Sequence, residues 1–509
     1  MLSQIDALFK LWTDNPGPGG QLLVTHKGKV IVDKCYGYAN IETQTPITQD
    51  SVFHVASISK SITAMAIAIL HDRGLLNVYD DVRNYVPEFI GFSEPLTIKQ
   101  MMNHVSGMRC HYALMYLQGR NNDDCVLHSE MLRLIARQKK LNFAPGEEFM
   151  YSNPNYVLMA TIVEKVTGQT FPNWVKENIL EPLGMKDSFI RSDPRTIVPN
   201  RVSSYNFDGY RFRNALLNLT MYGSTGLNTT CRDLTRFFAH YQNPTLLSRE
   251  TMESILFHVP EVKRGTTIYG GGLRFQEMLG HRYIHHGGVN AGFRTWGCLF
   301  PDDDLIVTIF TNVPSIPIET AGRDVARIVL GLPPRAKKDL EAYRAPAPQL
   351  DTLPGFYRCE ANGDYFDLTM EDGKLYNDGI LMTHRGDNIY QLGQLDYYMA
   401  LGETITVKEN SAIREYKKTE MTLPQELCRQ LAGSYYNDEV QGLWHLLWED
   451  GKFYWSHMRH GKQQLYWLKD ETFFTGSRML HVVRDDAGKI IGYNYQVGQI
   501  REMFFEKVK

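Results

Sequence analysis

The sequence lacks several features that would place a protein in a specialised class. Its seven cysteines stand singly between Cys35 and Cys428, without the close pairs of a disulfide framework or a zinc site. No apolar run approaches the ~20 residues of a membrane span, and residues 1–12 lack the apolar centre of a signal peptide. There is no dense basic cluster, so neither nucleic acid nor an anionic membrane is expected as a partner. We therefore expect a cytoplasmic protein with reduced thiols and with no metal or other cofactor.

What is present is typical of a globular protein. Of the 509 residues, 43% are apolar and 22% are charged, and the net charge is −3. A chain of this length is too long for one hydrophobic core, so we expect two or three domains. A homodimer is one assembly that the sequence leaves open.

The first candidate motif is a serine followed by a lysine three residues later. Ser57 and Lys60 stand between a short apolar segment, residues 52–56, and a predicted helix over residues 61–70. On a helix, this spacing puts both side chains on one face. A serine hydroxyl is a weak nucleophile until a base takes its proton, and a desolvated lysine can be that base. Ser57 is therefore the candidate nucleophile.

Two further motifs lie downstream. Tyr151 and Asn153 form a Tyr-x-Asn motif, and His285 with Gly287 forms a His-x-Gly motif that Gly288 follows. The segments 293–300 and 304–312 are rich in β-forming residues and are separated by Pro-Asp-Asp, which predicts a hairpin directly after the third motif.

Together the three motifs resemble those of serine β-lactamases and penicillin-binding proteins, in which Ser-x-x-Lys is followed by Tyr- or Ser-x-Asn and by a basic residue before x-Gly. The His-x-Gly form resembles the D-aminopeptidase branch of this superfamily. Four connecting segments resemble the family in the same order, which extends the likeness over residues 1–332: 103–108, 155–168, 182–185 and 226–237. The resemblance implies an α+β catalytic domain, an antiparallel sheet flanked by helices.

An internal repeat follows a Pro-rich linker at residues 333–350. Leu353 and Tyr357 recur as Leu431 and Tyr435, and an Asp-Gly turn at residue 372 recurs at 450, all with an offset of 78 residues. Alternating strands that run into Asp-Gly turns predict small antiparallel β domains. We expect two β-barrels, at residues 351–420 and 421–509. The resemblance implies that they are lipocalin-like.

In the D-aminopeptidases, a loop of the last barrel supplies an acidic residue that holds the substrate's amine. The equivalent stretch here, residues 470–479, is too short to match that loop, and no counterpart of the acid is evident. The resemblance therefore predicts the domain architecture of this chain better than it predicts the substrate specificity.

The resemblance implies catalysis through an acyl-enzyme on Ser57. The proton of Ser57 passes to Lys60, to Tyr151, or to both as a coupled unit. Tyr151 could be the base only as a phenolate, which at neutral pH needs a pKa well below the usual value of about 10. Asn153 is expected to bind Lys60 or the substrate, and His285 to orient Tyr151 or contact the substrate. The oxyanion hole is expected at the backbone N–H groups of Ser57 and Gly288, beside Gly287.

The third motif has a histidine where the family usually has a lysine, which is cationic at neutral pH. Because histidine is mostly neutral at pH 7, a substrate that carries a carboxylate is less expected. We therefore predict a serine hydrolase that acts on a small amide or short peptide, with D-aminopeptidase or D-amino-acid amidase activity. A carboxylesterase acting on esters, or a penicillin-binding protein with little turnover, is the alternative.

Overall fold

The computed structural model separates the chain into two units. Unit 1 comprises residues 1–206, 212–314 and 318–333, and unit 2 comprises residues 207–211, 315–317 and 334–509. The described residues are 1–14, 17–121, 123–208, 211–259, 268–335, 340–359, 361, 364–378, 380–392, 397–409, 412–419 and 423–508. Residues 336–339 of the predicted linker and the predicted boundary between residues 420 and 421 lie outside them, so the predicted domain limits stay a proposal.

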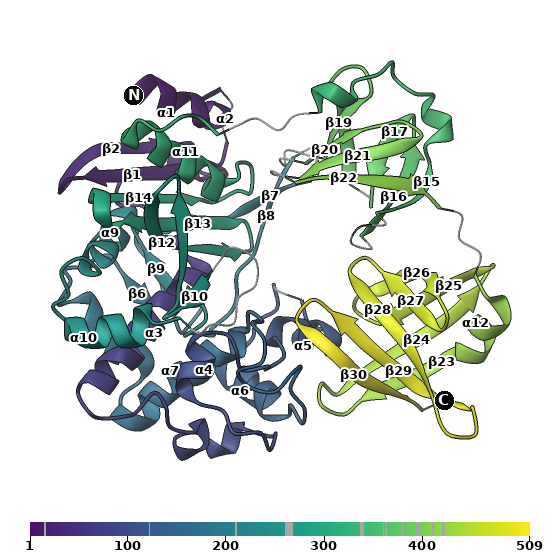
Figure 1. The fold of residues 1–509 in the computed structure, drawn as a ribbon, viewed down its shortest axis with the longest axis horizontal. Helices are drawn as coiled ribbons and strands as arrows, with labels where there is room; N and C mark the ends of the chain where they lie inside the picture. Colours follow the sequence, from purple (N-terminus) through teal and green to yellow (C-terminus); the bar gives the residue numbers. More distant parts are fainter. Residues whose placement is uncertain are drawn as a thin grey trace. The chain divides into compact units, whose positions relative to one another are not determined.

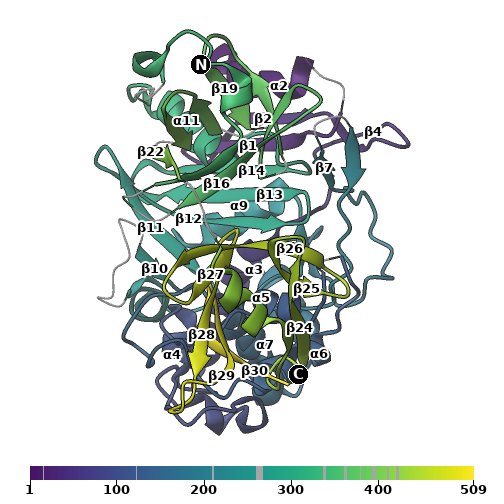
Figure 2. The same ribbon diagram turned by 90° about the vertical axis from the view of Figure 1, so that its right-hand side faces the viewer.

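Unit 1 is built around a seven-stranded antiparallel sheet, which Figures 1 and 2 show from two sides. The predicted hairpin after the third motif is confirmed as strands β13 and β14, and the N-terminal strand β1 pairs with β14. The strand order is β10 (Ile268–Gly270), β11 (Leu273–Met278), β12 (His281–Asn290), β13 (Phe293–Phe300), β14 (Leu305–Thr311), β1 (Gly20–His26) and β2 (Lys29–Tyr36).

Different helices cover the two faces of this sheet. A Cβ on Gly322 of α11 (Ile318–Leu330) would lie 2.3 Å from the Trp296 ring, and a Cβ on Gly297 would lie 2.5 Å from Phe238 of α9 (Cys231–His240). Consecutive residues of a strand point to opposite faces. Trp296 and Gly297 therefore show that α11 packs on one face of the sheet and α9 on the other. Each helix approaches the sheet so closely that only a glycine, Gly322 or Gly297, fits at the contact.

The helix that follows Ser57 lies inside the unit. Helix α3 (Ser59–Asp72) is buried at every residue from Ser59 to Leu70, and its residues 64–70 are all apolar, as expected for a helix buried on all sides. It packs against α7 (Asn153–Thr167), which begins at the Tyr-x-Asn motif and ends at Gly168 in the left-handed conformation. The predicted helix over residues 61–70 is confirmed as α3, which begins two residues earlier than expected.

The remaining elements of unit 1 are short. Its other helices are α1 (Leu2–Leu8), α2 (Lys10–Asp14), α4 (Ile98–Met102), α5 (His111–Leu117), α6 (His128–Ala136), α8 (Phe171–Val175) and α10 (Arg249–Thr251). Its 3₁₀ and π turns are η1 (Ala56–Ile58), η2 (Val82–Asn84), η3 (Pro87–Phe89), η4 (Lys176–Leu180), η5 (Met252–Phe257) and η6 (Pro301–Asp303). Its short strands are β3 (Tyr38–Asn40), β4 (Thr45–Pro46), β5 (Phe53–His54), β6 (Phe189–Ile190) and β9 (Leu227–Thr229), while β7 (Tyr205–Phe207) and β8 (Phe212–Asn214) flank the change of unit at residues 207–211.

Unit 2 contains two closed eight-stranded barrels, as the repeat predicted. In each barrel every strand pairs with the next, and the last pairs with the first, which leaves no free sheet edge. The first barrel consists of β15 (Gly355–Arg358), β16 (Tyr365–Glu371), β17 (Lys374–Asn377), β18 (Ile380–His384), β19 (Ile389–Leu392), β20 (Tyr397–Ala400), β21 (Thr404–Glu409) and β22 (Ala412–Lys418). The second consists of β23 (Gly433–Asn437), β24 (Gly442–Glu449), β25 (Lys452–His457), β26 (Gly461–Lys469), β27 (Thr472–Thr475), β28 (Arg478–Arg484), β29 (Ile490–Val497) and β30 (Ile500–Lys507), after helix α12 (Gln425–Leu431).

The repeated residues make the same contacts in both barrels. Tyr357 donates a hydrogen bond from its hydroxyl to the Leu353 carbonyl at 2.9 Å, and Tyr435 donates to the Leu431 carbonyl at 2.6 Å. Both Asp-Gly turns have two consecutive residues with positive φ, as a type I′ hairpin turn requires. The sequence repeat is therefore also a structural repeat.

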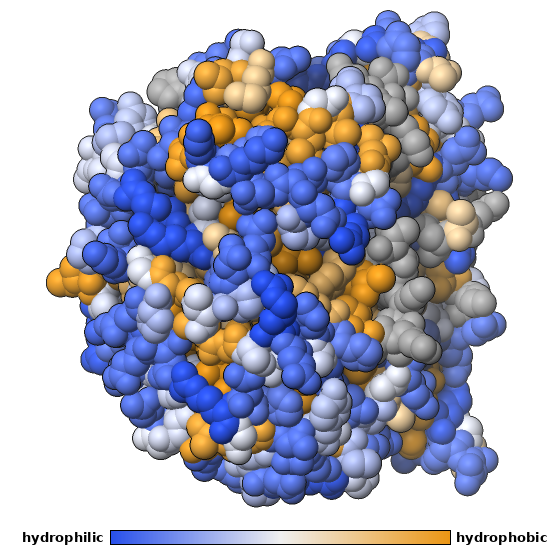
Figure 3. Space-filling model, turned by 60° about the vertical axis from the view of Figure 1, so that its left-hand side comes forward, coloured by the Kyte–Doolittle hydropathy of each residue, from blue (hydrophilic) through white to orange (hydrophobic). Residues whose placement is uncertain are grey.

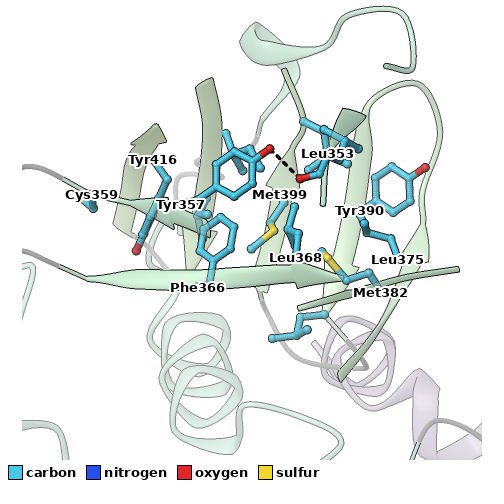
Figure 4. Close-up of a cluster of buried hydrophobic side chains, with 14 residues drawn as sticks. Leu353, Tyr357, Cys359, Phe366, Leu368, Leu375, Met382, Tyr390, Met399 and Tyr416 are labelled. Atoms are coloured by element: carbon cyan, nitrogen blue, oxygen red, sulfur yellow. Dashed lines mark hydrogen bonds between the residues drawn. The ribbon is translucent and has the colours of Figure 1, made fainter. Parts of the chain in front are cut away.

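Side chains fill the first barrel. Figure 4 shows its buried residues, among them Phe366, Leu368 and Met399, pointing into one cluster together with the Tyr357–Leu353 hydrogen bond. The predicted linker is held to this barrel, since Asn388 accepts from the Ala345 amide and donates to the Tyr343 carbonyl. Turns η7 (Glu341–Tyr343) and η8 (Leu350–Thr352) flank the Pro-containing stretch of residues 344–349.

The surface is mostly polar on the face that Figure 3 shows, with separate apolar patches between the polar residues. Scattered apolar surface is normal for folded proteins. Among the helices of the described residues, none has both the length and the apolar character to cross a membrane.

Candidate active site

Ser57 lies at the start of the buried helix, in turn η1. The preceding residue, Ala56, has a positive φ of 47°, a conformation that non-glycine residues seldom adopt and that is often found at functional sites. From Ser51 to Leu70, Ser57 is the one residue that is not buried. The local backbone therefore exposes one hydroxyl at the edge of a closed apolar region.

Lys60 is one turn further along and is completely buried. Its Nζ donates a hydrogen bond to Ser57 Oγ at 3.1 Å and another to the Ser224 carbonyl at 2.8 Å. Burial lowers the pKa of Lys60 to about 7. A large fraction of Lys60 is therefore neutral at neutral pH, and a neutral amine at this distance can take the proton of Ser57.

Tyr151 completes a cluster with these two residues. Its ring centroid lies 4.9 Å from Lys60 Nζ. Burial raises the pKa of Tyr151, and a hydrogen bond with Ser57 only partly opposes this effect. The structure thus brings together Ser57, Lys60 and Tyr151, and it favours a protonated phenol beside a lysine that can be neutral.

His104 holds the backbone next to Tyr151. Its Nδ1 accepts a hydrogen bond from the Ser152 amide at 3.0 Å, and its ring centroid is 4.2 Å from that of Tyr151. His104 is fully buried and has a positive φ of 59°. The sequence marked segment 103–108 only as a family resemblance, so this positioning residue was missed.

Asn153 makes a different contact from the expected one. Its Nδ2 lies 3.2 Å from Cys110 Sγ and donates to it, whereas Lys60 or the substrate was the predicted partner. Both residues are buried, Asn153 at 8% exposure and Cys110 at 1%. Negative charge on Cys110 would raise the pKa of both Lys60 and Tyr151, which indicates that the thiol is near the cluster. Cys110 carried no signal in the sequence.

The third motif is shifted by one residue from the prediction. His286, and not His285, faces the cluster: its ring centroid is 6.4 Å from that of Tyr151, and its Nε2 lies 3.1 Å from the Tyr269 hydroxyl. The physical reason is the alternation of side chains along β12. His286 and Gly288 share one face of the strand, while His285 and Gly287 share the other. The structure therefore corrects the predicted placement of His285.

His285 is buried on the side of the sheet that α11 covers. Its Nδ1 accepts a hydrogen bond from Trp296 Nε1 at 2.9 Å, and burial lowers its pKa to about 4. A neutral histidine that accepts from tryptophan fits a role in packing the sheet.

The two glycines differ in the same way. A Cβ on Gly288 would lie 2.2 Å from the Val55 carbonyl oxygen, so β12 approaches the chain just before Ser57 more closely than a side chain allows. Gly287 points to the opposite face, where its Cβ would have no neighbour closer than 3.4 Å. Gly288 is therefore close to the chain just before Ser57, and its role in an oxyanion hole stays a prediction.

Two further residues near the cluster come from β10 and β11. Tyr269 contacts His286 as described, and Arg274 lies close enough for its positive charge to lower the pKa of both Tyr151 and His286. Arg274 pairs with His285 in the β11–β12 ladder and is partly exposed. No sequence motif marked either residue.

A cavity of about 510 Å³ begins where β12 ends. Among its lining residues are Tyr112, Asp123, Asn206, Val289 and Asn290. Asn290 lies on the same face of the strand as His286 and Gly288, and Tyr112 is close enough to Tyr151 for their charges to interact. This cavity is therefore the candidate site for the part of a substrate that extends beyond the reacting carbonyl.

Comparison with known proteins agrees with this arrangement. Residues 6–330 match the Beta-lactamase family. A D-aminopeptidase of Cereibacter sphaeroides is 30% identical over 314 residues, so the match spans 60% of this chain and 58% of that relative's length. A D-aminopeptidase of Brucella anthropi is 25% identical over 521 residues and is matched over 97% of this chain and 96% of its own. The octameric penicillin-binding protein homologue from Pyrococcus abyssi has the same fold, with a TM-score of 0.60, 20% identity and coverage of 94% of this chain and 97% of its own.

Proposed function

Because the chain belongs to the Beta-lactamase family, we propose that it is a serine hydrolase that forms an acyl-enzyme on Ser57. The proposed substrates are small amides or short peptides, and the proposed activity is that of a D-aminopeptidase or D-amino-acid amidase, the class to which both curated relatives above belong. The observation that carries the proposal is the 3.1 Å contact between Ser57 Oγ and the buried Lys60 Nζ.

In the proposed mechanism, neutral Lys60 takes the proton from Ser57 as its oxygen attacks the substrate carbonyl. Tyr151, protonated and hydrogen-bonded to Ser57, relays a proton to the leaving amine. The lowered pKa of Lys60 and the raised pKa of Tyr151 both favour Lys60 as the base. The backbone N–H groups of Ser57 and Gly288 would bind the oxyanion, and one such donor contributes about 2.7–4 kcal/mol in comparable enzymes.

His286 takes the role that was first assigned to His285. Burial and the nearby charges of Lys60 and Arg274 lower its pKa well below the usual value, so it is neutral. A neutral imidazole beside Tyr151 can orient the phenol or accept from a substrate N–H. It does not offer the positive charge that a lysine in this motif would present to a carboxylate.

The second barrel supports a relaxed specificity. The stretch 470–479 comprises the four residues of β27, a tight turn on each side of it and the first two residues of β28, and it forms no long loop. We therefore expect acyl groups larger than a small D-residue to be accepted. We also propose that both barrels are lipocalin-like and that the protein is cytoplasmic, since all seven cysteines are free thiols. A homodimer stays a prediction.

A substrate panel tests this function. D- and L-amino-acid p-nitroanilides, short p-nitrophenyl esters and a cephalosporin should be assayed with the wild type and with Ser57→Ala. We expect turnover of D-amino-acid anilides that Ser57→Ala abolishes, and a fluorophosphonate adduct on Ser57 by mass spectrometry. Ester turnover without anilide turnover would instead identify a carboxylesterase, and full activity of Ser57→Ala would refute the assigned nucleophile.

A further inference from the structure

A second polar cavity lies beside strand β5, upstream of Ser57. It has a volume of about 100 Å³, and its lining includes His54, Arg191, Arg201, Ser203, Asn214 and Asn218. A single water molecule needs about 10–15 Å³ of such space. The cavity is thus large enough for a group the size of a phosphate or a carboxylate.

Two arginine side chains, Arg191 and Arg201, bring positive charge to the lining of this cavity. Burial, followed by repulsion from Arg201, lowers the pKa of the Arg191 guanidinium. Burial together with the charges of Arg191 and Arg201 lowers the pKa of His54 to about 3. His54 is therefore neutral at neutral pH, and the two guanidinium groups of Arg191 and Arg201 lie close enough to repel each other, a repulsion that a nearby anion would relieve.

Asp193 compensates this charge only in part. Asp193 attracts Arg191, but its carboxylate makes a two-pronged ion pair with the exposed Arg195. Glu42 is exposed and accepts a hydrogen bond from Asn214. Neither Asp193 nor Glu42 is among the residues that line the cavity.

One donor of the cavity is buried without a partner. Arg191 is 9% exposed, and its Nη2 donates to the Pro194 carbonyl, but its Nε is buried and has no hydrogen-bond partner. An unpaired N–H on a buried guanidinium costs free energy unless an acceptor enters the site. Guanidinium groups match oxyanions in both charge and geometry.

We propose that this cavity binds a small oxyanion, held by the guanidinium groups of Arg191 and Arg201. Neither Ser57, Lys60 nor Tyr151 lines this cavity, although it borders the cavity at the end of β12 and shares Asn214, Ala215 and Leu216 with it. Phosphate and sulfate are the simplest ligands of this class, and a carboxylate is the planar alternative.

Phosphate binding to the full-length protein tests the proposal. Isothermal titration with sodium phosphate at constant ionic strength should give saturable binding, and Arg201→Gln should raise the Kd about tenfold or more. Arg201 is exposed, so this variant is expected to fold, whereas Arg191→Gln removes a buried group and serves as a second variant. Arg195→Gln is the matched control, because Arg195 is exposed and already paired with Asp193.

Competition experiments separate the possible ligands. Competition by sulfate would support a site for tetrahedral oxyanions, and stronger competition by acetate would support a carboxylate site. The proposal is overturned if phosphate does not saturate, if chloride competes equally, or if Arg195→Gln weakens binding as much as Arg201→Gln does. It is also overturned if Arg274→Gln abolishes binding while Arg201→Gln does not, because phosphate would then lie beside Ser57.

Discussion

The surroundings of Ser57 and those of Lys99 both hold a buried lysine, but the two lysines are used differently. Lys60 and Lys99 are 0% and 7% exposed, and burial lowers their pKa to about 7 and about 8. Lys60 Nζ reaches a partly exposed serine. Lys99 Nζ donates instead to the carbonyl groups of Ile255 and His258.

The two histidines of β12 differ in the same way as the two lysines, since one faces the Ser57 cluster and the other does not. His286 faces Tyr151, and His285 accepts from Trp296 on the opposite face. A buried, neutral basic group is therefore not by itself the sign of an active site, although perturbed pKa values cluster at such sites. What distinguishes the Ser57 region is that several such groups converge on one accessible hydroxyl.

The largest expected effect separates the two lysines. Lys60→Met should lower kcat/KM by about 10³-fold or more, since a positioned general base contributes about 10²–10⁴-fold. Lys99→Met removes hydrogen bonds to two carbonyls and should lower the melting temperature while kcat/KM stays within about tenfold. Steady-state kinetics on the best substrate of the panel and thermal unfolding measure both effects. Equal losses of kcat/KM would mean that Lys60 has only a structural role.

The two histidines should differ by a smaller factor. His286→Ala should lower kcat/KM by about 10²-fold, the effect of misplacing a catalytic group such as Tyr151. His285→Ala leaves the Trp296 N–H buried and unpaired, so it should cost about 1–3 kcal/mol of stability and leave the kinetics of the folded enzyme close to those of the wild type. Chemical denaturation and kinetics of both variants provide the comparison. The opposite pattern would restore the role first predicted for His285.

The lowered pKa of Lys60 predicts a pH dependence of smaller size. Lys60 acts only when neutral, so kcat/KM should rise with pH and reach half its maximum at about pH 7, with a fall of about tenfold per unit below that. Between about pH 7 and 10.5 the unfolded chain holds a proton on Lys60 that the folded protein has lost. The unfolded state therefore binds more protons, and stability should rise with pH across this window.

Lys60→Met provides the control for the pH experiment. Its stability should lack the Lys60 part of this rise, so the difference in unfolding free energy from the wild type should change between pH 7 and 10. A constant difference, or activity that peaks well below pH 6, would indicate that Lys60 is charged in the folded enzyme.

Much of this arrangement could be predicted from sequence because its signals are local. Ser57 and Lys60 are linked by one helical turn, and the two barrels are linked by a repeat whose tyrosines and Asp-Gly turns impose the same contacts twice. Such patterns depend on spacing along the chain, which the sequence displays directly.

The other features of the candidate site could not be predicted, because they depend on contacts between segments that are distant in the sequence. His285 and His286 each stand two residues before a glycine, and only the face that β12 turns towards Tyr151 distinguishes them. Cys110 lies near the site from a segment that carries no motif, and the charge of Arg274 acts on Tyr151 and His286 from the neighbouring strand, so both effects follow from the tertiary fold alone. The sequence likewise left the base unassigned between Lys60 and Tyr151, because their pKa values depend on burial.

The smallest expected effect concerns Cys110, whose hydrogen bond in the Ser57 region is the one from Asn153. Cys110→Ala removes the acceptor of the Asn153 amide and should lower kcat/KM by about fivefold, which corresponds to about 1 kcal/mol for one neutral hydrogen bond. Cys110→Ser keeps an acceptor at nearly the same place and should recover most of the activity. Cys125→Ala is the matched control, since Cys125 is exposed. Separate values of kcat and KM, together with melting temperatures, decide the outcome: if the serine variant is as impaired as the alanine variant, Cys110 only fills space, and the hydrogen bond does not position Asn153.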